Sequence, residues 1–372
     1  MAATIAATMF CFAARARAAA HVPARDDIVL ATLPPLLLAM RTAPAPQADT
    51  ARAWRDAVAA ARGYIEAGRS SSDPRAYGYA QAALGPWWSA DPAPPEVLVT
   101  RARILQFRHE FAAALTQLEA ALRADPFAAD AWLLTASIAQ TQGHAQAARS
   151  ACLNLLRLAD GLVGATCSAA NAALEGRGEQ GQALLERALN VPSAVTPAQR
   201  AWAWTVLGEI RAQRGAAAPA EAALREALRL SPGEVYPLAA LADLLLDGGR
   251  AGEVRALLGD ATRADALLLR AAIAAKRSGD ADAAQLRTML GERFAETRAR
   301  DDATHLREEA RFALEVDGDA ARALELAQRN FATQKEYADA RLLLAAAQAA
   351  GDASAAQPAL AWLRRDTAKP TP

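Results

Sequence analysis

The feature that most constrains this chain is a pattern of large and small residues that recurs every 34 positions. In its clearest copy the pattern comprises Trp204, Leu207, Gly208, Gly215, Ala220, Leu224, Ala227 and Pro232. The glycine and alanine positions are small because two antiparallel helices must approach closely there, and the large residues fill the remaining space. Pro232 ends the second helix, since its nitrogen carries no proton for another helical hydrogen bond. The pattern therefore predicts a helix, a turn and a second helix.

The same spacing separates other large residues along the chain. Leu98 and Trp132 lie 34 positions apart, as do Trp204 and Leu238. This recurrence resembles the tetratricopeptide repeat, in which a large residue, a Leu-Gly pair, small alanines and a closing proline return with a period of 34. The resemblance covers about residues 51–365. It implies an all-α fold, a right-handed α-solenoid of about eight to nine helix-turn-helix repeats, because no helix pair can bury its apolar face alone.

The first repeat is irregular. Its two helices are expected over residues 54–68 and 75–87, separated by a long polar turn from Gly68 to Pro74. The later repeats are anchored at Leu98, Trp132, Leu162, Trp204, Leu238, Leu268, Leu306 and Leu343. In such a stack the first helix of each repeat is expected to line a concave face.

Both ends of the chain read differently from the repeats. Residues 1–20 predict a secretory leader, with an apolar stretch and a small-residue cleavage site at Ala18-Ala19-Ala20, although Arg15 and Arg17 interrupt it. Export would place the protein in the periplasm or outside the cell, and the alternative is a cytoplasmic protein with an Ala-rich tail. Residues 21–50 form an N-terminal extension with a proline-rich linker, and residues 366–372 form a polar tail.

Charge and hydropathy exclude several classes of partner. The chain carries 41 basic and 41 acidic residues, so its formal net charge is zero and we expect no nucleic-acid partner. No apolar run reaches the roughly 18 residues that a bilayer span requires, so no transmembrane segment is predicted.

No motif for enzyme chemistry stands out. Residues 176–181 match the letters Gly-x-Gly-x-x-Gly, but helical repeats flank them instead of the strand and βαβ unit that a dinucleotide site needs. The turn between two helices is therefore the preferred interpretation. The four histidines, His21, His109, His144 and His305, are not spaced as metal ligands. We expect no cofactor, no metal site and no enzyme.

The resemblance implies that Cys152 and Cys167 face each other. Cys152 would lie on the second helix of the third repeat, against the first helix of the fourth repeat, which carries Cys167. One expectation is that both are small core residues. The other, for an exported protein, is a disulfide between them.

The segment from His305 to Phe312 departs from the repeat pattern. Arg307 and Arg311 stand where other repeats carry a large apolar residue and a small one. A buried, unpaired guanidinium costs several kcal/mol, so we expect both to pair with Glu308, Glu309 or the acids at 301–302. His305 lies four residues before Glu309, which favours a surface ion pair between them. The segment is either a structural charge network or a partner-binding patch.

Candidates for partner binding are residues of the first helices that point away from the helix-pair core, together with the charged segment 305–312. They are Arg103, Phe107, Trp202, Glu209, Tyr236, Asp243, Arg270, His305, Arg307, Glu308, Arg311 and Phe312. Mixed arginine, aromatic and acidic side chains suit a protein or peptide ligand. Trp202 and Glu209 are singled out because the packing pattern of their repeat does not require them.

The preferred function is a non-enzymatic scaffold or adaptor that binds a protein or peptide in the concave groove. The alternative is a docking subunit of a bacterial envelope assembly that uses its edges or its convex face. Tetratricopeptide domains that bind chaperone C-termini use a Lys/Asn/Arg clamp, and the matching positions here lack the Lys-Asn pair, which disfavours that ligand.

Overall fold

A computed structural model describes residues 53–71, 73–259, 263–299 and 304–364. The expected leader, N-terminal extension and polar tail lie outside these residues. Every described residue belongs to one compact unit within residues 46–372. That unit is built from helices, and no strand occurs among the described residues.

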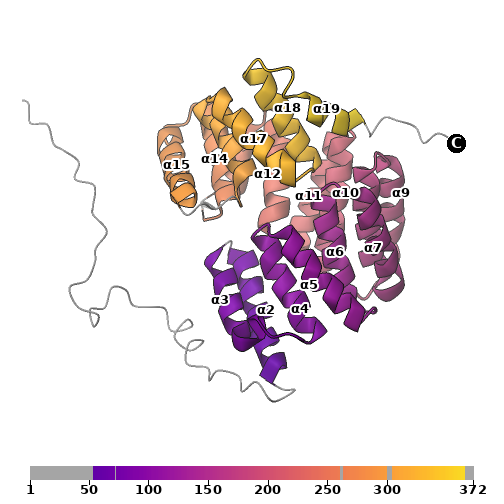
Figure 1. The fold of residues 1–372 in the computed structure, drawn as a ribbon. Helices are drawn as coiled ribbons and strands as arrows, with labels where there is room; N and C mark the ends of the chain where they lie inside the picture. Colours follow the sequence, from indigo (N-terminus) through magenta and orange to yellow (C-terminus); the bar gives the residue numbers. More distant parts are fainter. Residues whose placement is uncertain (1–52, 72, 260–262, 300–303, 365–372) are drawn as a thin grey trace, which may run out of the picture. The chain divides into compact units, whose positions relative to one another are not determined.

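Helices follow one another in antiparallel pairs that stack side by side (Figure 1). The first five pairs are α2 (Ala53–Ser71) with α3 (Arg75–Leu84), α4 (Pro95–Phe107) with α5 (Phe111–Ala124), α6 (Ala129–Thr141) with α7 (Ala145–Leu158), α8 (Gly161–Leu174) with α9 (Gly178–Leu189), and α10 (Pro197–Gln213) with α11 (Ala217–Leu230). The rest are α12 (Val235–Asp247) with α13 (Ala251–Leu258), α14 (Asp265–Ser278) with α15 (Ala283–Ala299), α16 (Leu306–Arg311) and the π-helix η2 (Phe312–Asp317) with α17 (Ala320–Thr333), and α18 (Tyr337–Ala349) with α19 (Gln357–Arg364).

The fifth pair shows how the repeat pattern produces the structure. Thr196 and Gln199 form a reciprocal capping box before α10, with bonds of 2.9 and 3.2 Å that satisfy two free backbone donors. A Cβ atom at Gly208 would lie 2.8 Å from Leu224 Cγ, so α10 and α11 touch because this residue has no side chain. Gly215 turns the chain with a φ of +77°, a conformation that favours glycine. The predicted close approach is confirmed.

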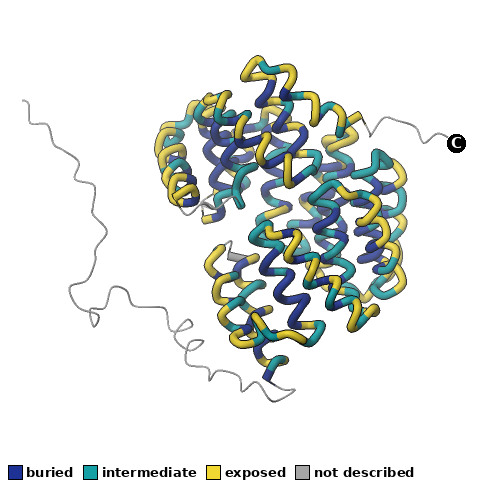
Figure 2. The backbone as a smooth tube through the Cα atoms, viewed as in Figure 1, coloured by how far each residue is buried: buried dark blue, intermediate teal, exposed yellow. Residues whose placement is uncertain are grey.

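Burial follows the faces between helices, and the outer turns are exposed (Figure 2). Leu207, Leu224, Leu241 and Leu245 are each at most 1% exposed. Burying such a side chain contributes about 1.5–3 kcal/mol. Buried residues gather in clusters that link neighbouring pairs, such as the one that holds Leu241 of the sixth pair and Leu268 of the seventh, as a solenoid requires.

The first repeat departs from its expected boundaries. Helix α2 continues to Ser71, so the expected turn from Gly68 to Pro74 is mostly helical. Helix α3 ends at Leu84 and a 3₁₀ turn, η1 (Gly85–Trp88), follows. Pro86 explains the early end, because it cannot donate the hydrogen bond that another α-turn needs.

The last repeat contacts the second and third repeats. The backbone N–H of Lys335 donates to the carbonyl of Thr141 at 2.8 Å. The side-chain nitrogen of Gln334 lies 3.3 Å from Nδ1 of His109. The turn between α17 and α18 therefore lies against the ends of α4 and α6, residues far away in the sequence.

Candidate partner-binding face

Polar and charged side chains from the first helices of successive repeats contact one another on one face of the stack. We call it the inner face and define it by Glu209, Tyr236, Asp243, Arg270 and Arg311. Arg270 donates two hydrogen bonds to the carboxylate of Asp243, at 3.0 and 2.6 Å. Arg311 donates to the same carboxylate at 2.7 Å. Asp243 and Arg311 are 68 residues apart, so this bond joins first helices that lie two repeats apart.

Electrostatics hold this trio in its charged form. Burial of Asp243 opposes ionisation, but the guanidinium groups of Arg270 and Arg311 outweigh it and hold the pKa of the carboxyl at about 2. Burial likewise opposes the charge of Arg311, and Asp243 and Glu315 together raise its pKa above the ordinary value. The Arg270 side chain is 8% exposed and that of Asp243 is 32% exposed. Asp243, Arg270 and Arg311 therefore neutralise one another within the protein.

Arg307 forms a second charge network with Glu336 and Asp339. Its guanidinium donates to both carboxylate oxygens of Asp339, at 2.6 and 2.8 Å, and to Glu336. Asp339 is 1% exposed, and its carboxylate also accepts a hydrogen bond of 2.6 Å from the side-chain amide of Asn330. Burial opposes the charge of Arg307, yet Glu336 and Asp339 raise its pKa well above the usual range.

Both arginines are paired, as expected, but their hydrogen bonds go to acids other than Glu308 and Glu309. Arg307 pairs with Glu336 and Asp339 of the next repeat, and Arg311 pairs with Asp243 and with Glu315 at 2.8 Å. The acids at 301–302 lie outside the described residues. Sequence spacing favoured neighbours on the same helix, whereas stacking brings later and earlier repeats closer to the guanidinium groups.

Two further expectations for the 305–312 segment are wrong. Phe312 is not on the inner face: it is 3% exposed and packs edge-on against Phe294, with ring centroids 5.4 Å apart. The carboxylate of Glu309 pairs with Arg298 and Arg322 instead of His305. The π-helix begins at Phe312, and its wider turn changes the register that an α-helical pattern assumes. His305 and Glu308 are half-buried at the start of α16.

Glu209 and Tyr236 are joined by a hydrogen bond, and neither forms an ion pair with an arginine of the inner face. The hydroxyl of Tyr236 donates to Oε1 of Glu209 at 2.5 Å, and the tyrosine is 59% exposed. The pKa of Glu209 is raised to about 7. Burial, the largest cause, and the charge of Glu336 raise it, while the Tyr236 hydrogen bond and Arg307 lower it. The charge of Glu209 in turn raises the pKa of Tyr236 well above its usual value.

Three further candidates contact residues of neighbouring helices. Trp202 is half-buried between the cores of the third to fifth repeats, so the expectation that packing does not require it is wrong. The Phe107 ring stacks on Tyr77, with centroids 3.4 Å apart. Arg103 lies 3.5 Å from Asp130, and its side chain is 36% exposed.

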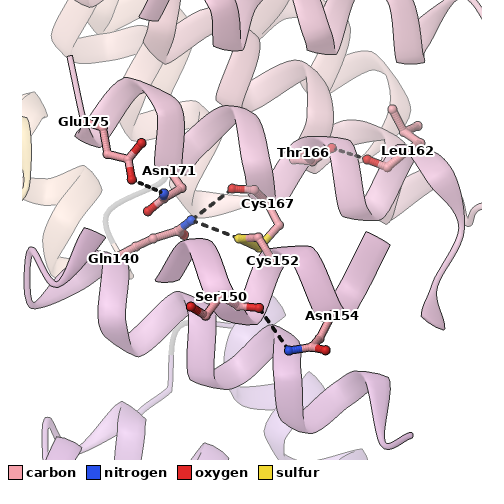
Figure 3. Close-up of a disulfide and its surroundings, with 9 residues drawn as sticks. All are labelled: Gln140, Ser150, Cys152, Asn154, Leu162, Thr166, Cys167, Asn171 and Glu175. Atoms are coloured by element: carbon pink, nitrogen blue, oxygen red, sulfur yellow. Dashed lines mark hydrogen bonds between the residues drawn. A yellow bond between two sulfur atoms is a disulfide. The ribbon is translucent and has the colours of Figure 1, made fainter. Parts of the chain in front are cut away.

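A disulfide joins Cys152 of α7 to Cys167 of α8, with Cα atoms 5.5 Å apart (Figure 3). The amide of Gln140 on α6 donates to the Cys167 carbonyl at 3.1 Å and lies 3.7 Å from Cys152 Sγ. Both cysteines are 1% exposed. The bond links the third repeat to the fourth inside the core.

Other kinds of site find little support in the described part of the chain. No group of three or more histidine, cysteine, aspartate or glutamate side chains there is placed to hold a metal ion. None of the helices in these ranges combines the length and apolar character needed to cross a membrane. Gly176 lies in the turn between α8 and α9, with a φ of +76°, and a Cβ atom at Gly181 would lie 2.7 Å from the Ala169 carbonyl oxygen. The Gly-x-Gly-x-x-Gly letters therefore mark a turn and a helix contact.

Sequence reasoning missed several acids that complete the inner face. Glu315, Glu336 and Asp339 supply the carboxylates for Arg311 and Arg307. A signal existed at Asp339, since it is an acidic residue among the apolar positions of the last repeat's first helix. A shallow depression of about 560 Å³, lined largely by apolar groups from α17, α18 and the turn before α19, was also not predicted.

No protein-family model and no curated protein matches the chain. Among solved structures, the APC/C hetero-tetramer Cut9–Hcn1 has a chain that is 13% identical with a TM-score of 0.50, covering 89% of this chain and 63% of that one. PilW, a type IV pilus biogenesis factor, is 22% identical over 54% of this chain and 94% of its own, with a TM-score of 0.44. A tetratricopeptide repeat protein from Parabacteroides merdae is 13% identical over 79% of this chain and 98% of its own, with a TM-score of 0.37.

The helix pairs, the small residues at their contacts and the likeness to the Cut9–Hcn1 chain agree. The chain has the fold of a tetratricopeptide repeat protein, an all-α solenoid of stacked helix pairs.

Proposed function

We propose that this protein is a non-enzymatic scaffold that binds an extended segment of a partner protein along its inner face. The observation that carries the proposal is the exposure of Tyr236. It presents a large aromatic side chain, 59% exposed, on a face whose arginines are otherwise paired internally. Exposed aromatic residues beside polar groups are typical anchors of protein interfaces.

Internal pairing also narrows the location of the binding site. Asp243, Arg270, Arg307 and Arg311 already hold their counter-ions, so a ligand would have to break those bonds to use them. The Glu209–Tyr236 pair holds no such counter-ion among the described residues. We therefore centre the site on these two residues.

The test is binding of a randomised decapeptide library to the full-length chain, measured by fluorescence polarisation. Tyr236→Ala is expected to lose most of the binding. Tyr79→Ala is the matched control, because Tyr79 is an exposed tyrosine at 36% that lies on α3, a second helix. Equal binding by both variants would contradict the proposal. Trp202 is not a suitable variant, because its loss would also disturb the core.

A docking subunit that uses its edges is the second candidate. Phe127 and Val191, which lie in the loops before α6 and α10, are 76% and 59% exposed. Such residues can anchor a partner at the edge of the stack. A docking subunit would keep its assembly in the Tyr236→Ala variant and lose it in Phe127→Ser.

We further propose that the protein works in an oxidising compartment, the periplasm or the cell exterior. The pairing of Cys152 with Cys167 supports this, because disulfides persist mainly outside the cytosol. The expected leader over residues 1–20 agrees with it. Mass spectrometry of the protein from its native host would find a mature N-terminus near residue 21 if the leader is cleaved, and an intact Met1 form would contradict export through this leader.

A further inference from the structure

The inner face repeats one arrangement twice, with different partners. Glu209 and Asp243 lie 34 residues apart, at the same position of successive repeats. Each carboxylate accepts a hydrogen bond from a residue 27 positions further along, on the next first helix. For Asp243 that residue is Arg270, and for Glu209 it is Tyr236. The structure thus contains an acid–arginine pair next to an acid–tyrosine pair.

The two carboxylates differ in the charge that surrounds them. Asp243 receives two guanidinium groups. Among the described residues, Glu209 accepts a side-chain hydrogen bond from the Tyr236 hydroxyl alone, and a hydroxyl cannot neutralise a carboxylate. The pKa values reflect this difference, since that of Asp243 lies at about 2 and that of Glu209 at about 7. The fifth repeat therefore lacks the cation that the sixth repeat obtains from the chain itself.

The surroundings of Glu209 do not supply that cation. The groups that act on its charge from neighbouring elements are the neutral hydroxyl of Tyr236 on α12 and the charges of Glu336, at the start of α18, and Arg307 on α16. Arg307 is held by both oxygens of Asp339 and by Glu336. Glu336 adds negative potential, so the balance at Glu209 favours a positive ligand.

Tyr236 adds a second means of holding a cation. Its side chain is largely exposed, and the face of an aromatic ring attracts lysine and arginine groups. A guanidinium placed beside Tyr236 could pair with Glu209 while it stacks on the ring. The contacts of Arg270 and Arg311 with Asp243 show how this face receives guanidinium groups one repeat further along.

We propose that the Glu209–Tyr236 pair receives a lysine or arginine side chain of the bound peptide. This inference rests on the proposed function and names the chemistry of its ligand. The partner segment is basic at the position that meets the fifth and sixth repeats. An acidic segment would meet an unpaired carboxylate and be repelled.

The test uses the full-length chain at pH 8 and three decapeptide libraries with arginine, glutamine or glutamate at the centre and neutral residues elsewhere. We expect the arginine library to bind roughly tenfold more tightly than the glutamine library, as one ion pair with a cation–π contact predicts. In Glu209→Gln, which keeps an acceptor for Tyr236, this ratio should fall below about twofold. Glu325→Gln, an acid 70% exposed on α17, is the matched control and should keep the ratio.

A second measurement guards against a misfolded Glu209→Gln, namely thermal unfolding at pH 4, where the variant should unfold at the wild-type temperature. The inference is overturned if the glutamine or glutamate library binds to the wild-type chain as well as the arginine library does, or if the preference survives in Glu209→Gln. In those cases the proposed function still stands, because a peptide is bound. If no library binds, the proposed function is contradicted as well.

Discussion

Arg311 donates a hydrogen bond of 2.7 Å to Asp243 across 68 residues of sequence. This contact joins the eighth repeat directly to the sixth. In a solenoid held only by contacts between neighbours, stability is a sum of local terms. A direct bond between alternate repeats couples them more strongly than neighbour contacts alone.

Asp243→Asn should therefore destabilise the protein. It leaves Arg270 and Arg311 without their shared carboxylate, and we expect a loss of about 2 kcal/mol in the free energy of unfolding by urea. Asp247→Asn is the matched control on the same helix, because its pair with Arg341 is half exposed and should contribute about 0.5 kcal/mol or less. The pKa of Asp243 is lowered, so its contribution is complete above about pH 4 and is lost as the pH falls toward 2. Equal losses in both variants would contradict this account.

Glu209→Gln should have the opposite effect on stability. The pKa of Glu209 in the folded protein is about 7, above the ordinary 4.5, so the folded state holds the proton more tightly than the unfolded state. Ionisation of the wild-type residue thus costs stability from about pH 4.5 upward, in full above pH 7. The variant avoids that cost, and its Tm should exceed the wild-type Tm by roughly 1–3 °C at pH 8 and match it at pH 4. A variant less stable at pH 8 would show that the carboxylate is compensated.

The disulfide should stabilise the junction of the third and fourth repeats. Cys152 and Cys167 close a loop with a separation of 15 residues, for which chain entropy predicts about 3 kcal/mol. The double variant Cys152→Ser/Cys167→Ser should lose about that amount under oxidising conditions. It should also abolish the effect of reductant on urea unfolding. Mass spectrometry of the unreduced wild-type protein that found two free thiols would contradict the bond.

Gly208 and Gly63 should respond oppositely to a side chain. Gly208→Leu places atoms where Leu224 and the Ala220 carbonyl already lie, and we expect a loss of about 1–3 kcal/mol. Gly63 lies inside α2 with nothing within 4 Å of an added Cβ, so Gly63→Ala should gain about 0.5–1 kcal/mol from helix propensity. Thermal unfolding of both variants is the measurement. A stable Gly208→Leu would show that α10 and α11 are not packed at this contact.

The repeat period predicted the helix pairs, their turns and their buried faces, because these depend on residues within one 34-residue unit. It did not predict the partners of Arg307 and Arg311. Those contacts depend on the curvature that accumulates over several repeats, which the period does not specify. Phe312 was misplaced for a local reason, since a π-helix breaks the assumed α-helical register. The expected lack of nucleic-acid binding rests on net charge and stays a prediction.

Glu209 and Tyr236 could be named from sequence as residues on the inner face, but their significance could not. It became visible only beside Asp243 and Arg270, where the corresponding acid is neutralised. Trp202 shows the reverse, because a residue outside the core pattern of its own repeat packs against the neighbouring repeats.

The most direct test of the account is site-specific photo-crosslinking in the native host. A photoreactive phenylalanine analogue is placed at Tyr236 on the inner face in one sample and at Phe127 on the repeat edge in another. The account predicts that position 236 crosslinks to a discrete partner and that an excess of the arginine-centred library suppresses this crosslink. Position 127 should give little or no crosslinked product. A partner captured from position 127 alone would contradict binding on the inner face.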